Sequence, residues 1–158
     1  MINTQDNIYM ARALVLARRG SYSTQPNPRV GCVLVKQGEI IAEGWHQRAG
    51  QGHAEVEALK KTQEANGATA YVTLEPCSHT GRTAPCAKAL IAAGVSRVVV
   101  AMQDPNPLVA GQGIKRMQDA GIEVECGVLQ QEVEILNKGF IKRMTTGLPF
   151  VRSKMAMS

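Results

Sequence analysis

The sequence lacks the features that mark several classes of protein. No run of apolar residues approaches the ~18 that a membrane span requires, and the first residues, MINTQDNIYMARAL, do not show the basic and then apolar layout of a secretion signal. It also has no acidic or proline- and serine-rich tract of the kind found in disordered chains. We therefore expect a cytoplasmic protein without a membrane partner, and its 158 residues, 44% of them apolar, suffice for one folded core.

Aromatic residues are scarce, at 4% of the chain, which argues against the stacking platforms of proteins that bind single-stranded nucleic acid. The net charge of +5 comes from Lys and Arg residues that are scattered along the sequence. Clustered cations, not scattered ones, give proteins their non-specific affinity for nucleic acids. We expect no nucleic-acid partner and interpret the charge as a preference for anionic small molecules.

Cysteine is too rare for a disulfide framework. In a reducing compartment the four residues, Cys32, Cys77, Cys86 and Cys126, are expected to be free thiols or metal ligands. Cys32 and Cys126 lie in apolar runs, so we predict that both are small buried residues.

Hydrophobic periodicity predicts alternating helices and strands. Helices are expected over residues 6–19, 53–67, 86–93, 114–120 and 131–144, and strands over 30–36, 39–43, 70–74, 97–102 and 122–126. The first two strands are separated by Gln37-Gly38, which is typical of a hairpin. Alternation of this kind favours parallel strands with helices on both faces of the sheet. The predicted fold is a three-layer α/β/α sandwich around a mixed, mostly parallel five-stranded sheet.

The last residues, LPFVRSKMAMS from 148 to 158, are apolar and strand-like, yet no later segment is present to pair with them. We therefore predict one domain over residues 1–146. Residues 147–158 are interpreted as the beginning of a further domain.

A histidine, a glutamate and two cysteines form the most informative pattern. His53-Ala-Glu55 begins one expected helix, and Cys77 and Cys86 flank the start of the next. Because open α/β sheets place their sites at the carboxyl ends of the strands, both helix starts should lie at the same end of the sheet. One imidazole and two thiolates are a zinc ligand set that leaves a fourth position for water, as catalytic zinc requires.

Glu55 is the candidate catalytic residue. A carboxylate beside a water molecule on zinc is suited to general acid/base catalysis. On a regular helix, positions i and i+2 point about 200° apart. His53 and Glu55 can therefore share a pocket only if the backbone is irregular here or the metal lies above the helix end.

The order His53-Ala-Glu55 and then Pro76-Cys77 resembles the signature of the zinc nucleobase deaminases, the cytidine deaminase superfamily. The general signature has two residues between its cysteines, whereas eight separate Cys77 from Cys86. This longer spacing is similar to that of the pyrimidine deaminases of riboflavin biosynthesis. The resemblance covers nearly the whole chain, in five blocks: residues 26–31 (PNPRVG), 44–46 (GWH), 52–55 (GHAE), 76–86 (PCSHTGRTAPC) and 104–107 (DPNP).

The resemblance implies a zinc-dependent hydrolase with one Zn²⁺ per chain, in which Glu55 moves protons. Its substrate would be 2,5-diamino-6-ribosylamino-4(3H)-pyrimidinone 5′-phosphate, which loses its 2-amino group to give 5-amino-6-(5-phosphoribosylamino)uracil and ammonia, an early step of riboflavin biosynthesis. We also expect a homo-oligomer. Bacterial members of the family commonly fuse this deaminase to a reductase, whose first strand FVRSKMAMS resembles, so NADPH would bind only to that further domain.

The segment between the two cysteines offers hydroxyl, imidazole and guanidinium donors, a chemistry suited to a phosphate or a ribose. We interpret it as a substrate clamp. The resemblance implies six substrate contacts: Asn27, His46, His79, Arg82, Asp104 and Asn106. Of these, Asn27 would bind the pyrimidine and Arg82 the phosphate. From the residues alone, Asp104-Pro-Asn-Pro is equally typical of a turn.

Two alternatives remain open from the sequence. A structural zinc site in a basic RNA-binding module would use His79, Cys32 or Cys126 as a fourth ligand and would leave Glu55 without a purpose. Another zinc nucleobase deaminase, acting on cytosine, guanine or tRNA adenosine, would keep the chemistry and change the substrate. Binding of tRNA would weaken strongly with salt, because many phosphates would be contacted.

Overall fold

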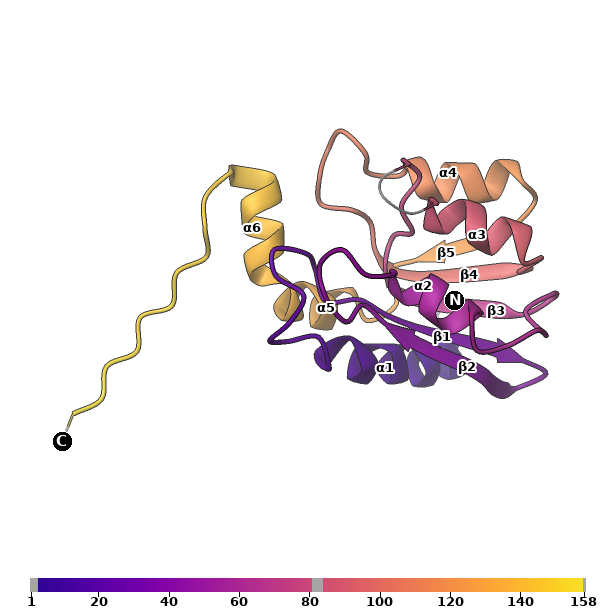
Figure 1. The fold of residues 1–158 in the computed structure, drawn as a ribbon, viewed down its shortest axis with the longest axis horizontal. Coiled ribbons are helices and arrows are strands. Elements are labelled where there is room, and N and C mark those ends of the chain that lie inside the picture. The colour runs from indigo at the N-terminus through magenta and orange to yellow at the C-terminus, as the bar shows by residue number, and fades with distance from the viewer. Residues whose placement is uncertain (1–2, 81–83, 158) are drawn as a thin grey trace.

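A five-stranded sheet with helices on both faces forms the centre of the computed structural model, which describes residues 3–80 and 84–157 (Figure 1). The strand order is β2 (Glu39–Trp45), β1 (Gly31–Lys36), β3 (Thr69–Leu74), β4 (Arg97–Met102) and β5 (Glu123–Cys126). Strand β1 is antiparallel to both of its neighbours, while β3, β4 and β5 are mutually parallel. Four strands therefore point the same way, which confirms the predicted mixed sheet.

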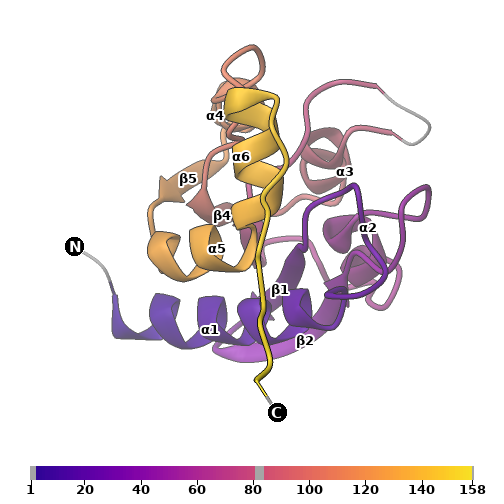
Figure 2. The same ribbon diagram turned by 90° about the vertical axis from the view of Figure 1, so that its left-hand side faces the viewer.

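Two layers of helices cover this sheet, as the two views show (Figures 1 and 2). Helices α1 (Thr4–Arg18) and α5 (Gln130–Leu136) lie on one face, and α2 (Ala54–Leu59), α3 (Cys86–Ala92) and α4 (Gln112–Asp119) lie on the other. Helix α6 (Lys138–Thr146) continues from α5 beyond the end of the sheet. The predicted three-layer α/β/α sandwich is confirmed.

The core is made of small and β-branched side chains that suit a sheet buried on both faces. Val98, Val99 and Val100 of β4, a strand with a neighbour on each side, are fully buried. On β2, a Cβ atom added at Gly44 would stand 2.3 Å from the backbone oxygen of Ala54. The absence of a side chain at Gly44 thus lets the first turn of α2 approach the sheet closely, which fixes where His53 and Glu55 lie.

Two helices differ from the sequence prediction. The helix expected over residues 53–67 ends at Leu59, and Thr62 then accepts a hydrogen bond from the backbone N–H of Glu64, a local turn that competes with the helix. The helix expected over residues 131–144 is divided into α5 and α6 at Asn137. The buried Asn137 side chain bonds the backbone of Arg29 on both sides, accepting from its N–H at 2.9 Å and donating to its carbonyl at 3.0 Å.

The prediction of a buried Cys126 is wrong, because β5 is a short edge strand and Cys126 is exposed at its end, whereas Cys32 is buried as predicted. The strand-like segment 148–157 is exposed and has no regular secondary structure (Figure 1). Over the two described ranges, we find no helix with the length and apolar character needed to cross a membrane.

Candidate metal centre and active site

A cavity of about 230 Å³ opens where β2, β3 and β4 end. These strands point the same way, so the segments that follow them meet at the end of the sheet formed by their carboxyl ends. The cavity is lined by Asn27, Pro28, Val30, His46, His53, Glu55, Leu74, Glu75, Cys77, His79, Asp104 and Phe140. Seven of the residues predicted from the sequence are among them: Asn27, His46, His53, Glu55, Cys77, His79 and Asp104.

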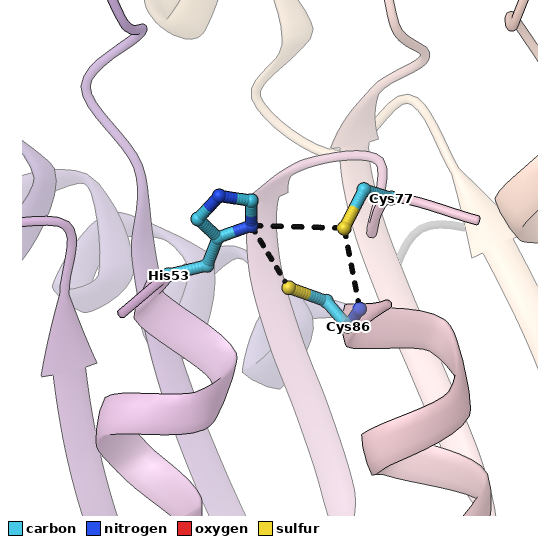
Figure 3. A group of neighbouring side chains, drawn as sticks. All are labelled: His53, Cys77 and Cys86. Carbon is cyan, nitrogen blue, oxygen red and sulfur yellow. Dashed lines mark hydrogen bonds between the residues drawn. The ribbon is translucent and has the colours of Figure 1, made fainter. Parts of the chain in front are cut away.

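Three predicted metal ligands converge beside this cavity (Figure 3): His53 and Cys77 line it, and the buried Cys86 lies next to them. The ring nitrogen Nδ1 of His53 lies 3.0 Å from Sγ of Cys86 and 3.6 Å from Sγ of Cys77. The backbone N–H of Cys86 donates to the Cys77 sulfur at 3.2 Å, so the first turn of α3 closes over the turn that follows β3.

The donor set and its spacing fit zinc. Two atoms that bind a tetrahedral zinc ion at 2.0–2.3 Å are separated by about 3.6 Å, close to the two nitrogen-to-sulfur distances of 3.0 and 3.6 Å. Three protein ligands leave one position of the tetrahedron for water or substrate. In residues 3–80 and 84–157, no other group of three or more His, Cys, Asp or Glu side chains has ligand atoms gathered this closely. The possible fourth ligands Cys32, Cys126 and His79 do not join it.

The pKa values of the two thiols are shifted in opposite directions. Hydrogen bonds from the Cys86 thiol and the His53 ring lower the pKa of Cys77 to about 4. The pKa of Cys86 is raised, first by its hydrogen bond to Cys77 and then by burial. Cys77 is therefore a thiolate at neutral pH, which is the form that binds a metal.

Glu55 points into the same cavity because α2 begins after His53. His53 is the N-cap, with an extended backbone (φ −72°, ψ 163°), and Ala54 is the first helical residue. The angular separation of positions i and i+2 on a regular helix therefore does not apply. Glu55 is only 3% exposed, and this burial raises the pKa of its carboxyl group. A carboxyl group with a pKa moved towards neutrality is suited to both accepting and donating a proton.

Asn27 and His46 form a linked pair on one wall. The Asn27 amide Nδ2 lies 3.1 Å from Nε2 of His46, and Nδ1 of His46 lies 3.1 Å from the carbonyl oxygen of Gly52. Donation from Nδ1–H to Gly52 leaves Nε2 to accept from Asn27, which is the neutral form of the ring. Burial also lowers the pKa of His46. His46 thus orients Asn27, whose amide can still offer an oxygen and a second N–H to a ligand.

The remaining predicted contacts divide into three groups. His79, which is exposed, and Asp104 line the cavity. Asn106 does not line it, and its side-chain oxygen accepts from the N–H of Leu108 at 3.1 Å. The N–H of Asn106 in turn donates to Oδ1 of Asp104 at 2.9 Å, so Asp104-Pro-Asn-Pro forms the turn that was one of its two interpretations. Arg82 lies outside the described residues.

Sequence reasoning missed two residues. Glu75 lines the cavity, and its carboxylate accepts hydrogen bonds from four backbone N–H groups. The signal for Glu75 is its position directly before Pro76-Cys77, at the end of a buried strand. Asn137 acts from outside the cavity, where it fixes Arg29 next to the segment that carries Asn27.

Comparison with known proteins agrees with this geometry. The sequence model of the family described as "Cytidine and deoxycytidylate deaminase zinc-binding region" matches residues 3–102. The riboflavin biosynthesis protein RibD of Escherichia coli strain K12 is 64% identical over 155 residues, which are 98% of this chain and 42% of that protein. The chain thus spans about two-fifths of the length of this curated relative.

A shorter relative matches from end to end. The diaminohydroxyphosphoribosylamino-pyrimidine deaminase of Buchnera aphidicola subsp. Schizaphis graminum is 48% identical over 146 residues, covering 92% of this chain and 99% of that protein. Among solved structures, a diaminohydroxyphosphoribosylaminopyrimidine deaminase/5-amino-6-(5-phosphoribosylamino)uracil reductase from Thermotoga maritima has a TM-score of 0.88 and 45% identity, covering 92% of this chain and 43% of that one.

Proposed function

The chain belongs to the cytidine and deoxycytidylate deaminase zinc-binding family, and on this premise we propose that it hydrolyses the 2-amino group of 2,5-diamino-6-ribosylamino-4(3H)-pyrimidinone 5′-phosphate. The products are 5-amino-6-(5-phosphoribosylamino)uracil and ammonia. The observation that carries the proposal is the cluster of His53, Cys77 and Cys86, two of which line the same cavity as the buried Glu55. The choice of substrate is supported by the Buchnera deaminase, which the chain matches over 99% of its length.

One Zn²⁺ per chain would be held by His53 Nδ1 and the two thiolates. When bound, zinc supplies Lewis-acid activation of water at neutral pH. The chain prepares this site by keeping Cys77 ionised and by holding the Cys77 sulfur with the first backbone N–H of α3. Both features reduce the reorganisation that binding of the metal requires.

Glu55 would carry the protons of the reaction. It accepts one from the attacking water and delivers it to the adjacent ring nitrogen as the oxygen joins C2. It then moves the second proton to the 2-amino group, which leaves as ammonia while the 2-oxo group forms. The raised pKa of Glu55, caused by burial, brings the carboxyl group closer to the range in which both transfers are efficient.

Substrate orientation would depend on the walls of the cavity. Asn27, oriented by His46, is positioned to bind the polar edge of the pyrimidine. Asp104 and His79 also line the cavity, and the sugar phosphate would extend towards the exposed His79. Arg82 is proposed as the phosphate contact because it belongs to the long segment between the two cysteines.

The test measures ammonia release by zinc-loaded chain from the diaminopyrimidine ribosyl phosphate, with cytidine in parallel. We expect release from the first substrate only, and a loss of kcat of at least about 100-fold in Glu55→Gln with the zinc retained. Glu57→Gln, two residues further along the same helix, is the matched control and should stay near the wild-type rate. Release from cytidine alone would assign another substrate, and activity of Glu55→Gln would remove Glu55 from the mechanism.

The proposal extends to residues 147–158 as the beginning of a reductase domain that would use NADPH. The Thermotoga maritima relative, which is named as both a deaminase and a reductase, supports the reductase part of this proposal. Apolar side chains exposed in and beside this segment, such as Leu148 and Phe150, support a role in further packing.

We also propose that copies of the chain associate into a homo-oligomer. Sedimentation of the chain at several concentrations tests this point, and a monomer at all of them would contradict it.

A further inference from the structure

A second glutamate of the cavity, Glu75, is held in place by several backbone hydrogen bonds. It follows the last residue of β3, and its own N–H donates to the carbonyl of Met102 at 3.0 Å, which continues the pairing of β3 with β4. The residue is 6% exposed. A carboxylate buried to this extent requires hydrogen-bond donors or a cation as partners.

Four backbone N–H groups meet this requirement. Oε2 of Glu75 accepts from Asp104 at 2.9 Å and from Gly111 at 3.0 Å. Oε1 accepts from Gly113 at 2.9 Å and from Ile114 at 3.2 Å. Gly111 is the N-cap of α4, so the carboxylate ties both ends of the segment between β4 and α4 to the end of β3.

Helix α4 in turn presses on the turn that carries Cys77. A Cβ atom added at Gly113 would stand 1.9 Å from the carbonyl oxygen of Pro76, so this contact requires glycine. The Arg116 guanidinium donates to the carbonyl of Ser78 at 2.8 Å, one residue beyond Cys77. The start of α4 therefore contacts the backbone on both sides of a metal ligand.

The bonding of Glu75 excludes the role that Glu55 has. A carboxylate has about four acceptor positions, and here four N–H donors occupy them, so Glu75 has no position left for a substrate proton or a metal. We infer that Glu75 is a positioning residue that sets the place of Asp104 in the cavity and seats α4 on the metal-binding turn. This inference rests on the proposed function only where it concerns substrate binding through Asp104.

The first test needs no activity. In Glu75→Gln the side chain keeps one acceptor oxygen but turns an NH₂ group towards two of the four donors. Hydrogen exchange at the two backbone amides that face the NH₂ group, either those of Asp104 and Gly111 or those of Gly113 and Ile114, should then become at least about ten-fold faster. Amides in the inner strand β4 should keep their wild-type exchange, and so should all amides of Glu39→Gln, an exposed control on the edge strand β2.

The second test uses the kinetics of the zinc-loaded chain. We expect KM of Glu75→Gln to rise about ten-fold, while kcat changes less than about three-fold and both limbs of the pH profile stay in place. In an Asp104→Ala background the same substitution should raise KM no further, because Glu75 would act through Asp104. Glu75→Asp, which keeps the charge but shortens its reach, is measured in the same way and is the substitute should Glu75→Gln fail to fold.

The inference is overturned by unchanged exchange at all four amides that bond Glu75, by a loss of kcat at constant KM, by a displaced limb of the pH profile, or by additive effects with Asp104→Ala. If the wild-type chain releases no ammonia, the proposed function fails, and the exchange experiment alone still decides the role of Glu75.

Discussion

The break between α5 and α6 at Asn137 gives a prediction that connects fold and site. Asn137 is 4% exposed and closes two hydrogen bonds with the backbone of Arg29, at 2.9 and 3.0 Å. The Arg29 guanidinium in turn donates a hydrogen bond, at 3.3 Å, to the carbonyl of Leu136, which is the last residue of α5. We predict that Asn137→Ala destabilises the fold and loosens the segment that carries Asn27.

The magnitude follows from the groups that lose their partners. The substitution removes two hydrogen bonds and leaves one backbone N–H and one carbonyl of Arg29 without them. Each orphaned group in a partly buried place costs about 1–2 kcal/mol, so the free energy of unfolding should fall by about 2–4 kcal/mol. For a chain of this length that corresponds to a lower melting temperature by roughly 5–15 °C.

Urea denaturation followed by circular dichroism measures the loss, with the m-value checked for constancy. Asn66→Ala, at an exposed asparagine in a turn, is the matched control and should change the free energy of unfolding by less than about 0.5 kcal/mol. For the active chain we expect KM to rise more than kcat falls, since Asn27 would lose its fixed place. A loss below about 0.5 kcal/mol, equal to that of the control, would refute the reasoning.

Three further predictions concern the rest of the molecule. Asp6→Asn removes a carboxylate that accepts hydrogen bonds from Arg97 at 2.9 and 3.0 Å. These hydrogen bonds are the first cause of the lowered pKa of Asp6. The stability that the Asp6 carboxylate adds is therefore complete above about pH 4 and is lost as the pH falls through the lowered pKa. Urea titrations should show a deficit of about 2–3 kcal/mol for the variant at pH 7 that shrinks below about pH 4, and a deficit independent of pH would contradict this. Gly113→Ala should lower the melting temperature because its Cβ would meet the Pro76 oxygen at 1.9 Å, whereas Gly139→Ala, with its nearest contact at 3.7 Å, should leave it unchanged or raise it. Removal of zinc by a chelator should lower the melting temperature of the wild-type chain in calorimetry, and an equal effect on a variant lacking one thiol ligand would exclude the proposed site.

Much of the fold is predictable because its signals are local. Runs of β-branched residues mark the strands, and the change from period two to period 3.6 marks the helices. The convergence of the candidate metal ligands was predictable for a related reason, since His53, Cys77 and Cys86 are placed by the ends of elements whose direction follows from the alternation of strands and helices.

The features that were missed depend on partners far along the chain. The pattern of residues 131–144 is helical throughout, and the break at Asn137 arises from its bonds to Arg29, 108 positions away. Glu75 has the same property, because its four donors lie 29 to 39 positions further on and converge only when α4 docks. Cys126 was misjudged because a local apolar run cannot show that its strand lies at the edge of the sheet.

The directions of the strands also place the candidate active site at one end of the sheet and leave the opposite end free for modification. The cavity lies at the end of the sheet where β2, β3 and β4 finish, and short turns at the opposite end of the sheet join β1 to β2 and α4 to β5. At Gly38 and Gly121, which lie in these turns, the space around an added Cβ atom is open within 4 Å. Because Gly38 has a positive φ, where a side chain is strained, the neighbouring exposed residue Glu39 is the position to modify. A fluorescent label, an affinity tag or a tether to a surface at Glu39 would leave the candidate metal centre untouched, so binding could be followed on immobilised protein without interference from the attachment.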